Sequence, residues 1–226
     1  MKRKDLFDRA IWCRISPFVA YVFFMLLAEL LSKSGWSAYE LHLLYVVKIA
    51  VVAALLWVLK GVYVELRLPH SPDVQTWGVA VAAGVVVFVA WINLDAGWME
   101  IGASAGFDPR GDAGVDWIMV VARLTGAVLV VPLMEELFWR SFLMRWIAKH
   151  DFLTVEPARI GPKAYVVSAV LFAFEHNLWL AGLLAGAVYG LLYMRSGLLW
   201  SPILAHAVTN AMLGVWVIYT GNWSYW

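Results

Sequence analysis

Cysteine is almost missing from this chain, since Cys13 is the only one among its 226 residues. A single thiol excludes a disulfide within the chain and any cysteine-based metal cluster. Charge is scarce too, at 15% of the residues, and the net charge of +1 gives no indication of nucleic acid binding. In contrast, 63% of the residues are hydrophobic and the mean hydropathy is +0.75. These values predict an all-α, polytopic membrane protein.

The apolar runs are long enough for about seven transmembrane helices. The predicted spans are residues 15–31, 39–59, 76–94, 117–149, 164–180, 181–195 and 198–219. If the spans alternate in direction, nearly all basic residues between them fall on the side of the N-terminus, leaving only Lys33 and Arg110 on the other side. Because basic segments stay in the cytoplasm, we expect an integral membrane protein with a cytoplasmic N-terminus.

One lysine, Lys48, interrupts the second predicted span near its middle. A charged side chain at that depth extends toward the membrane surface or pairs with an acid on a neighbouring helix. Glu29 in the first span is the candidate partner. A structural role for Lys48 is therefore favoured over a catalytic one.

Two consecutive glutamates, Glu135 and Glu136, lie inside the fourth predicted span. A carboxylate surrounded by apolar residues costs several kcal/mol unless it is paired, protonated or in contact with water. Arg140 follows Glu136 by one helical turn, so these two residues are expected to form an ion pair. Glu135 points about 100° away around the helix and has no such basic neighbour, which is typical of a general base. An acidic cap on a helix end is the structural alternative.

The fourth predicted helix is about 33 residues long, or about 50 Å, which exceeds a simple perpendicular crossing. Pro132 lies just before the glutamates. Proline removes a backbone hydrogen bond, and helices break inside membranes where they border a cavity. A kink and a cavity are therefore expected near Glu135.

Three further polar residues lie at a similar depth to Glu135, counted from the cytoplasmic ends of their helices. They are His176, His206 and Asn210. Phe172 precedes His176 by four residues, and His206 precedes Asn210 by four, so each pair shares one helix face. A lone histidine in a membrane helix is more often structural than catalytic. Four polar groups at one depth favour a functional site.

These four residues suit the activation of water for attack on a carbonyl group. Glu135 can take a proton from water while His176 orients that water, and His206 with Asn210 can stabilise the oxyanion that develops. No serine nucleophile lies nearby in a recognised motif, which favours direct hydrolysis. Alternatively, Glu135, His176 and His206 can supply three ligands to a catalytic zinc. Neither histidine has the spacing of the HExxH motif, so the sequence leaves the cofactor open.

Three short motifs on these helices together resemble the signature of the CAAX protease and bacteriocin-processing (Abi) family of intramembrane proteases. The family pattern is EExxxR, FxxxH and HxxxN. The chain has EELFWR at residues 135–140, FAFEH at residues 172–176 and HAVTN at residues 206–210. The resemblance covers about residues 131–211 and leaves residues 1–115, with three spans, unmatched. We therefore expect an N-terminal unit of residues 1–115 and a catalytic core of residues 116–226.

The resemblance implies a membrane endopeptidase that cleaves a C-terminal or juxtamembrane segment of a membrane-associated protein or peptide. It also implies that Glu135 and His176 activate water, that His206 and Asn210 stabilise the oxyanion, and that three residues support them. These supporting residues are Glu136, Arg140 and Phe172. Family members are often labelled metalloproteases, and a metal-free glutamate mechanism is also proposed for the family.

Two other functions use similar residues. A proton-coupled transporter needs intramembrane acids, histidines and a broken helix, but the polar groups here gather at one place and no inverted repeat is visible. A binding or immunity protein can keep such motifs without activity. All three motifs are complete in this chain, which favours the protease.

Overall fold

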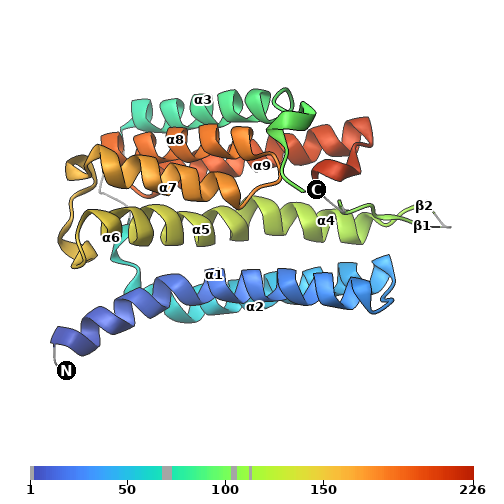
Figure 1. The fold of residues 1–226 in the computed structure, drawn as a ribbon, viewed down its shortest axis with the longest axis horizontal. Helices are drawn as coiled ribbons and strands as arrows, with labels where there is room; N and C mark the ends of the chain where they lie inside the picture. The colour runs from blue at the N-terminus through green and yellow to red at the C-terminus, as the bar shows by residue number, and fades with distance from the viewer. Residues whose placement is uncertain (1–2, 68–72, 103–105, 112–113) are drawn as a thin grey trace.

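The computed structural model describes residues 3–67, 73–102, 106–111 and 114–226. Its helices are α1 (Arg3–Lys33), α2 (Ala38–Leu59), α3 (Val74–Trp91), α4 (Trp117–Thr125), α5 (Val131–Glu136), α6 (Arg145–Ala148), α7 (Pro162–Phe174), α8 (Trp179–Ser196) and α9 (Trp200–Thr220). In the described residues, the strands are β1 (Arg110–Gly111) and β2 (Gly114–Val115), which pair antiparallel. The helices lie side by side as a bundle (Figure 1), which confirms the all-α prediction.

The predicted long fourth helix is present as one rod of 32 residues, Trp117–Ala148. Two π-helical segments interrupt its α-helical winding, η4 (Gly126–Val130) and η5 (Leu137–Met144). A π-helix is wider than an α-helix and usually marks an inserted residue or a functional site. We call this element the catalytic rod, because it carries Glu135, which the sequence predicts to be catalytic. The rod runs through the middle of the bundle in Figure 1.

Five helices are long and apolar enough to cross a membrane, within the described parts of the chain. They are Arg9–Lys33, Ala38–Val62, Val74–Trp91, Trp117–Ala148 and Trp200–Thr220. The apolar helix α7 is shorter, with 13 residues. These helices confirm an integral membrane bundle. The count of seven crossings is not confirmed, and the cytoplasmic N-terminus stays a prediction.

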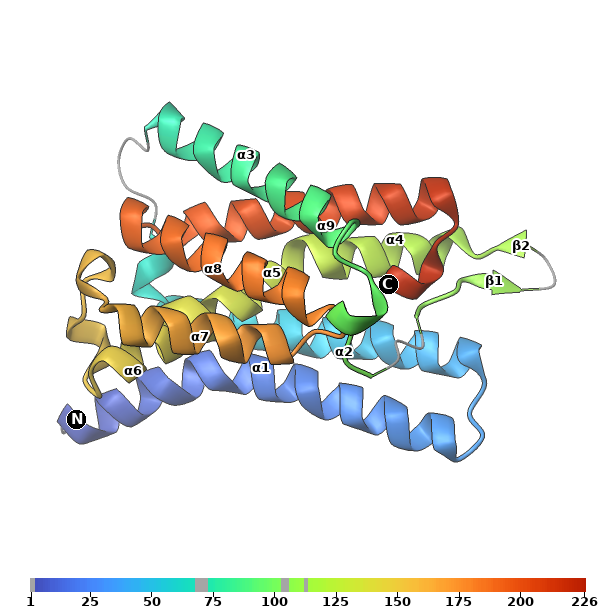
Figure 2. The ribbon, with the colours of Figure 1, turned by 45° about the horizontal axis from the view of Figure 1, so that its top comes forward.

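The bundle has an N-terminal hairpin on one side of the catalytic rod and four helices on the other. Helices α1 and α2 pack along each other and touch the rod, while α7 and α8 pack together beyond it (Figure 2). Helix α3 lies on α9 and α8 rather than on the N-terminal hairpin. The third helix therefore contacts the part of the bundle that holds the polar motifs.

Glycine allows two of these contacts to be close. A Cβ atom at Gly84 of α3 would lie 2.4 Å from the backbone oxygen of Ala205 in α9. A Cβ atom at Gly186 of α8 would lie 3.1 Å from Ala169 Cα in α7. Small residues at such crossings let helix backbones approach, which is the main source of packing energy between helices in lipid.

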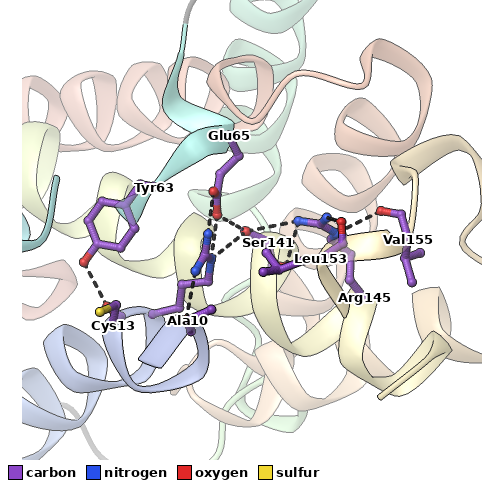
Figure 3. Close-up of polar contacts among 9 residues, drawn as sticks. Ala10, Cys13, Tyr63, Glu65, Ser141, Arg145, Leu153 and Val155 are labelled. Carbon is purple, nitrogen blue, oxygen red and sulfur yellow. Dashed lines mark hydrogen bonds and ion pairs between the residues drawn. The ribbon is translucent and has the colours of Figure 1, made fainter. Parts of the chain in front are cut away.

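A buried polar network joins the N-terminal hairpin to the catalytic rod (Figure 3). Arg14 of α1 donates to both carboxylate oxygens of Glu65, at 2.7 and 2.6 Å, and to the Ala10 carbonyl at 2.8 Å. Glu65 follows α2, in the short helix η2 (Val64–Leu66), and also accepts a hydrogen bond from Ser141 of the rod. The Glu65 carboxylate thus joins three segments that are far apart in the sequence.

The charge of Glu65 is stabilised within this network. Burial raises the pKa of this carboxyl, but hydrogen bonds from Arg14 and Ser141 and the positive charge of Arg14 outweigh burial and lower the pKa below its ordinary value of 4.5. Arg145 extends the network, because its guanidinium donates to the carbonyls of Val155 at 3.1 Å and Leu153 at 3.2 Å.

The expected contact between Lys48 and Glu29 is not made. Glu29 pairs instead with Lys33 on its own helix at 2.6 Å, where both side chains are exposed. Lys48 is 8% exposed and does not extend to the surface. Its ammonium lies 4.0 Å from the ring centroid of Tyr21 and 4.8 Å from that of Tyr45. Aromatic faces therefore take the place of the expected carboxylate.

Candidate active site

Pro132 shapes the catalytic rod just before the glutamate pair. In the π-helical segment η4 the Val131 N–H bonds to the Gly126 carbonyl, five residues back. The next bond in this register would run from residue 132 to the Ala127 carbonyl, but proline has no N–H. Asn210 of α9 fills this position, because its Nδ2 donates to the Ala127 carbonyl at 2.8 Å. The expected backbone disruption is therefore present and is bridged by a motif residue.

Glu136 lies at the centre of the polar motifs, with no exposed surface. Its carboxylate pairs with Arg140, with Nε to Oε2 at 3.1 Å, as the sequence predicts. It also accepts from His206 Nδ1 at 3.0 Å, a contact that sequence reasoning missed. The spacing of four residues revealed the first partner, whereas the second is 70 positions away in the chain. Glu136 thus joins the catalytic rod to α9.

His206 is held on two sides. Glu136 binds its Nδ1, and the ring stacks on Tyr189 of α8 with centroids 5.0 Å apart and planes 21° apart. The Tyr189 hydroxyl donates to Thr209 Oγ1 at 2.7 Å, and Thr209 in turn lies 2.9 Å from the Gly84 carbonyl of α3. A carboxylate only accepts, so Nδ1 carries a proton. The Nε2 atom of the ring remains available to a ligand.

His176 lies in a different setting from the one expected. The sequence predicts a helix through residue 180, but α7 ends at Phe174 and α8 begins at Trp179. The last turn tightens, because the His176 N–H bonds to the Ala173 carbonyl three residues back at 3.1 Å. His176 nevertheless stays near Phe172, with its Nδ1 2.9 Å from the Phe172 carbonyl. In the neutral ring this contact leaves Nε2 as an acceptor.

Phe172 packs among the other motif residues and is 1% exposed. Its ring centroid lies 4.7 Å from that of His176 and 6.3 Å from that of His206. The Arg140 guanidinium carbon lies 4.3 Å from the same ring. Phe172 therefore separates the two histidines while covering the arginine of the ion pair.

One cavity of about 180 Å³ brings the predicted residues together. Its wall includes all four candidates for water activation and oxyanion stabilisation, namely Glu135, His176, His206 and Asn210. Glu135 is 4% exposed, and its Oε2 has no hydrogen-bond partner among the described residues. The four groups come from the catalytic rod, the turn after α7, and α9. The structure therefore unites residues that the sequence placed at one depth.

Comparison with known proteins identifies a family for part of the chain. Residues 117–212 match the family model of the type II CAAX prenyl endopeptidase Rce1-like proteins. The chain therefore carries a CAAX prenyl endopeptidase Rce1-like domain. No curated protein and no solved structure matches the chain. This match supports a CAAX-type intramembrane protease at the level of the family.

The Rce1-like domain contains all seven motif residues, but residues outside it complete the cavity wall. Tyr21 of α1, Tyr45 of α2 and Trp91 of α3 contribute from the N-terminal side, and Tyr225 and Trp226 contribute from the end of the chain. Their sequence context is an ordinary apolar span or an aromatic tail. No spacing rule identifies such residues, because their position depends on the tertiary packing.

Two further residues close to the Rce1-like motifs were not singled out by the sequence. Trp139 donates from its indole Nε1 to Glu175 Oε2 at 2.9 Å, which links the catalytic rod to the turn after α7. The sequence contained part of the information needed to find this contact, because Glu175 is an acid beside His176 in an apolar span. An intramembrane acid usually has a specific partner.

A metal does not fit the side chains as they lie in the Rce1-like domain. In the described residues, no group of three or more histidine, cysteine, aspartate or glutamate side chains is arranged to hold a metal ion. The zinc alternative required Glu135, His176 and His206 to converge. Instead, the Nδ1 atoms of the two histidines are engaged by the Phe172 carbonyl and Glu136, and the Nε2 atoms do not form a ligand set with Glu135.

Proposed function

We propose that the protein hydrolyses a peptide bond in a C-terminal or juxtamembrane segment of a membrane-associated protein or peptide, with a water molecule as the nucleophile. The main support is the buried carboxylate of Glu135, which shares a cavity with two histidines and an asparagine and has an oxygen without a hydrogen-bond partner among the described residues. Such an oxygen is available to accept a proton from water.

Glu135 acts as the general base in this proposal. It removes a proton from water as the water oxygen attacks the carbonyl carbon of the scissile bond. The separate roles of the two glutamates follow from their partners. Glu136 is committed to Arg140 and His206, so its charge is balanced. Glu135 has no such partner and can change its protonation state.

His176 positions the attacking water. Its Nδ1 is fixed by the Phe172 carbonyl at 2.9 Å, so the neutral ring presents Nε2 as an acceptor. A water molecule bound between Nε2 and Glu135 would have both protons directed at acceptors and a lone pair directed at the substrate. This orientation converts an ordinary solvent molecule into an aligned nucleophile.

Asn210 and His206 stabilise the oxyanion of the tetrahedral intermediate. Asn210 uses one N–H for the Ala127 carbonyl, which fixes its orientation and leaves the second N–H free. His206, held by Glu136 at Nδ1, leaves its Nε2 available to the same oxyanion. When the intermediate collapses, Glu135 returns its proton to the amide nitrogen, the C–N bond breaks and the amine leaves.

The test uses the full chain purified in detergent and a fluorescent peptide with a cysteine four residues from its C-terminus, either farnesylated or unmodified. We expect Glu135→Gln to reduce kcat by a factor of about 10² or more, because a positioned general base contributes about 10² to 10⁴ to the rate. The thermal unfolding midpoint should stay unchanged, since glutamine has the same shape.

The matched control is Glu156→Gln, which changes an exposed glutamate paired with Arg159 far from the cavity. This variant should cleave at the wild-type rate. Cleavage by Glu135→Gln at the rate of this control would refute the assignment of the general base.

A further inference from the structure

Arg123 is a cation on the cavity wall that forms no ion pair with a carboxylate of the described residues. It belongs to α4 and lines the same cavity as Glu135. Its guanidinium carbon lies 4.5 Å from the ring centroid of Tyr45 and 5.5 Å from that of Phe107. Its Nε is buried and has no hydrogen-bond partner within the described ranges. Two aromatic faces thus support the side chain without neutralising it.

Lys48 is a second cation in the same neighbourhood. It lies on α2, and its ammonium is 4.8 Å from the ring of Tyr45, the tyrosine that also contacts Arg123. Tyr21, the other ring beside Lys48, is 4.0 Å away and also lines the cavity. Two basic side chains from different helices therefore flank one cavity tyrosine.

The ion pairs of the described residues leave both of these basic side chains out. These ion pairs include Arg14–Glu65, Lys33–Glu29, Arg110–Asp108, Arg140–Glu136, Arg159–Glu156 and His206–Glu136. None of these pairs includes Arg123 or Lys48. Unpaired cations in an apolar span cost several kcal/mol each and mark functional sites, with an anion as the missing partner.

We propose that Arg123, assisted by Lys48, binds the free C-terminal carboxylate of the substrate peptide. This inference rests on the proposed function and makes it more specific, because it selects a C-terminal segment over an internal juxtamembrane one. A guanidinium binds a carboxylate through two parallel hydrogen bonds, and the low dielectric of the site strengthens that contact. Arg123 is thus a specificity-determining residue, and it takes no part in bond breaking.

The anion that binds Arg123 is part of the peptide that is cleaved, because Arg123 and Glu135 line one cavity. A lipid head group or a separate ion bound at Arg123 would occupy the space that the substrate needs. An acidic side chain of the substrate offers the same chemistry as a C-terminal carboxylate, so the experiment has to separate these two sources.

The position of Arg123 also limits the length of the released fragment. Arg123 and Glu135 are 12 positions apart on the catalytic rod, or about 18 Å along its axis. An extended peptide covers about 3.3 to 3.6 Å per residue, so about five residues span this distance. The long side chain of arginine reduces that number. We expect the enzyme to release a C-terminal fragment of about three to five residues.

The first experiment needs no variant. Wild-type protein is given three versions of the fluorescent peptide that differ only at the C-terminus, namely a free carboxylate, a carboxamide, and a carboxamide after a terminal aspartate. The carboxylate version should be cleaved at least about tenfold more efficiently than the plain amide, since a hydrogen bond to a charged group contributes about 1.5 to 3 kcal/mol. Equal kcat/KM for acid and amide would overturn the proposal, as would full rescue by the terminal aspartate.

Variants then assign the preference to a residue. Arg123→Gln should lower kcat/KM for the carboxylate peptide to the level of the amide, mainly through KM, and Lys48→Met should have a smaller effect in the same direction. The control Arg110→Gln removes an exposed arginine that pairs with Asp108, and it should keep the full preference. Retention of the preference by a folded Arg123→Gln variant would refute the role of Arg123.

Binding separates this inference from the proposed function. The catalytically impaired Glu135→Gln protein is titrated with the acid and amide peptides, and fluorescence polarisation measures each Kd. Tighter binding of the acid by about tenfold or more supports carboxylate recognition even if wild type cleaves neither peptide. In that case the hydrolase assignment fails while the binding assignment stands. Equal Kd values overturn the binding assignment, whatever the cleavage assay shows.

Discussion

At the scale of single residues, Glu136 stands out because its fully buried carboxylate contacts both Arg140 and His206. Burying three charged or polar groups is tolerated only while each has its partner. If the carboxylate loses its charge, Arg140 stays in the core without an anion and His206 loses the group that orients its ring. The site and the fold therefore depend on the same side chain.

We predict that Glu136→Gln lowers the free energy of unfolding by about 3 to 5 kcal/mol, which is the usual cost of leaving a buried charge unpaired. Glu156→Gln is the control, because it breaks an exposed glutamate–arginine pair that contributes at most about 1 kcal/mol. The thermal unfolding midpoint in detergent measures both. Similar midpoints for the two variants would contradict a supporting role for the buried pair.

A second residue-scale prediction concerns Asn210. Replacement by alanine leaves the Ala127 carbonyl without the donor that compensates for Pro132, at a cost of about 1 to 3 kcal/mol. The variant Asn210→Asp removes the donor but keeps the size of the side chain. Both variants should lose activity and stability together in cleavage and thermal unfolding assays. An alanine variant with unchanged stability would mean that the Asn210 contact has no structural role.

The sequence predicted individual residues where local spacing determines contacts. The pair Glu136–Arg140 follows from a spacing of four, and the depth of Glu135 follows from counting along the helix. The bond from Glu136 to His206 and the wall residues Tyr21 and Tyr45 could not be predicted, because no local rule specifies which helices are neighbours. The choice between a zinc site and a metal-free site could not be made from the sequence for the same reason, since side-chain orientation across helices decides ligand geometry.

At the scale of elements, close crossings determine where the motif residues lie. Helix α3 meets α9 at Gly84, where the Gly84 carbonyl also lies 2.9 Å from the Thr209 hydroxyl. Thr209 accepts from Tyr189, and Tyr189 stacks on His206. A change in the distance between α3 and α9 is therefore transmitted to a residue of the cavity wall.

We predict that Gly84→Ala destabilises the protein by about 1 to 3 kcal/mol, because the new methyl group would lie 2.4 Å from the Ala205 carbonyl oxygen. Gly78→Ala on the same helix is the matched control, since a Cβ there meets nothing within 4 Å. That control should be neutral or stabilising by up to about 1 kcal/mol, as alanine favours helix. Thermal unfolding of both variants provides the measurement, and equal effects would argue against a close crossing.

Element boundaries were predicted well where apolar runs ended at polar residues, as at Trp117 and near Ala148. The end of α7 was predicted wrongly, because residues 175–180 are compatible with a helix by composition. The chain turns there instead, and the Ile101 N–H bonds to the Asn177 carbonyl at 2.8 Å. This contact between distant segments has no signature in the local sequence.

At the scale of the whole molecule, the Rce1-like domain is joined to the N-terminal hairpin through the network of Arg14, Glu65 and Ser141. Arg14 is 1% exposed and has Glu65 as its anion. These contacts do not test the expected division into residues 1–115 and residues 116–226, but they connect residues of both units. Loss of the carboxylate would leave a buried guanidinium between them.

The pH dependence of stability follows from the lowered pKa of Glu65. A carboxyl with a lowered pKa in the folded protein adds stability above its unfolded value of 4.5, and that stability is lost as the pH falls through the folded value. We expect Glu65→Gln to unfold at a lower temperature than wild type at pH 7. The difference should shrink below about pH 4.5. A difference that is constant from pH 7 to pH 3.5 would show that the charge of Glu65 is unimportant.

The wide winding of the catalytic rod at residues 137–144 marks a place where the length of the chain can change by one residue. A π-helical turn accommodates a residue that an α-helix would exclude, so loss of a single codon there would let the rod relax to ordinary winding with its two ends still aligned. Loss of Leu133 in the α-helical segment Val131–Glu136 would instead turn everything beyond it by about 100°. Ser141 and Arg145 would then face away from Glu65 and Val155, although no functional group had been removed. Chain length before residue 137 is therefore as strict a requirement as chemical identity.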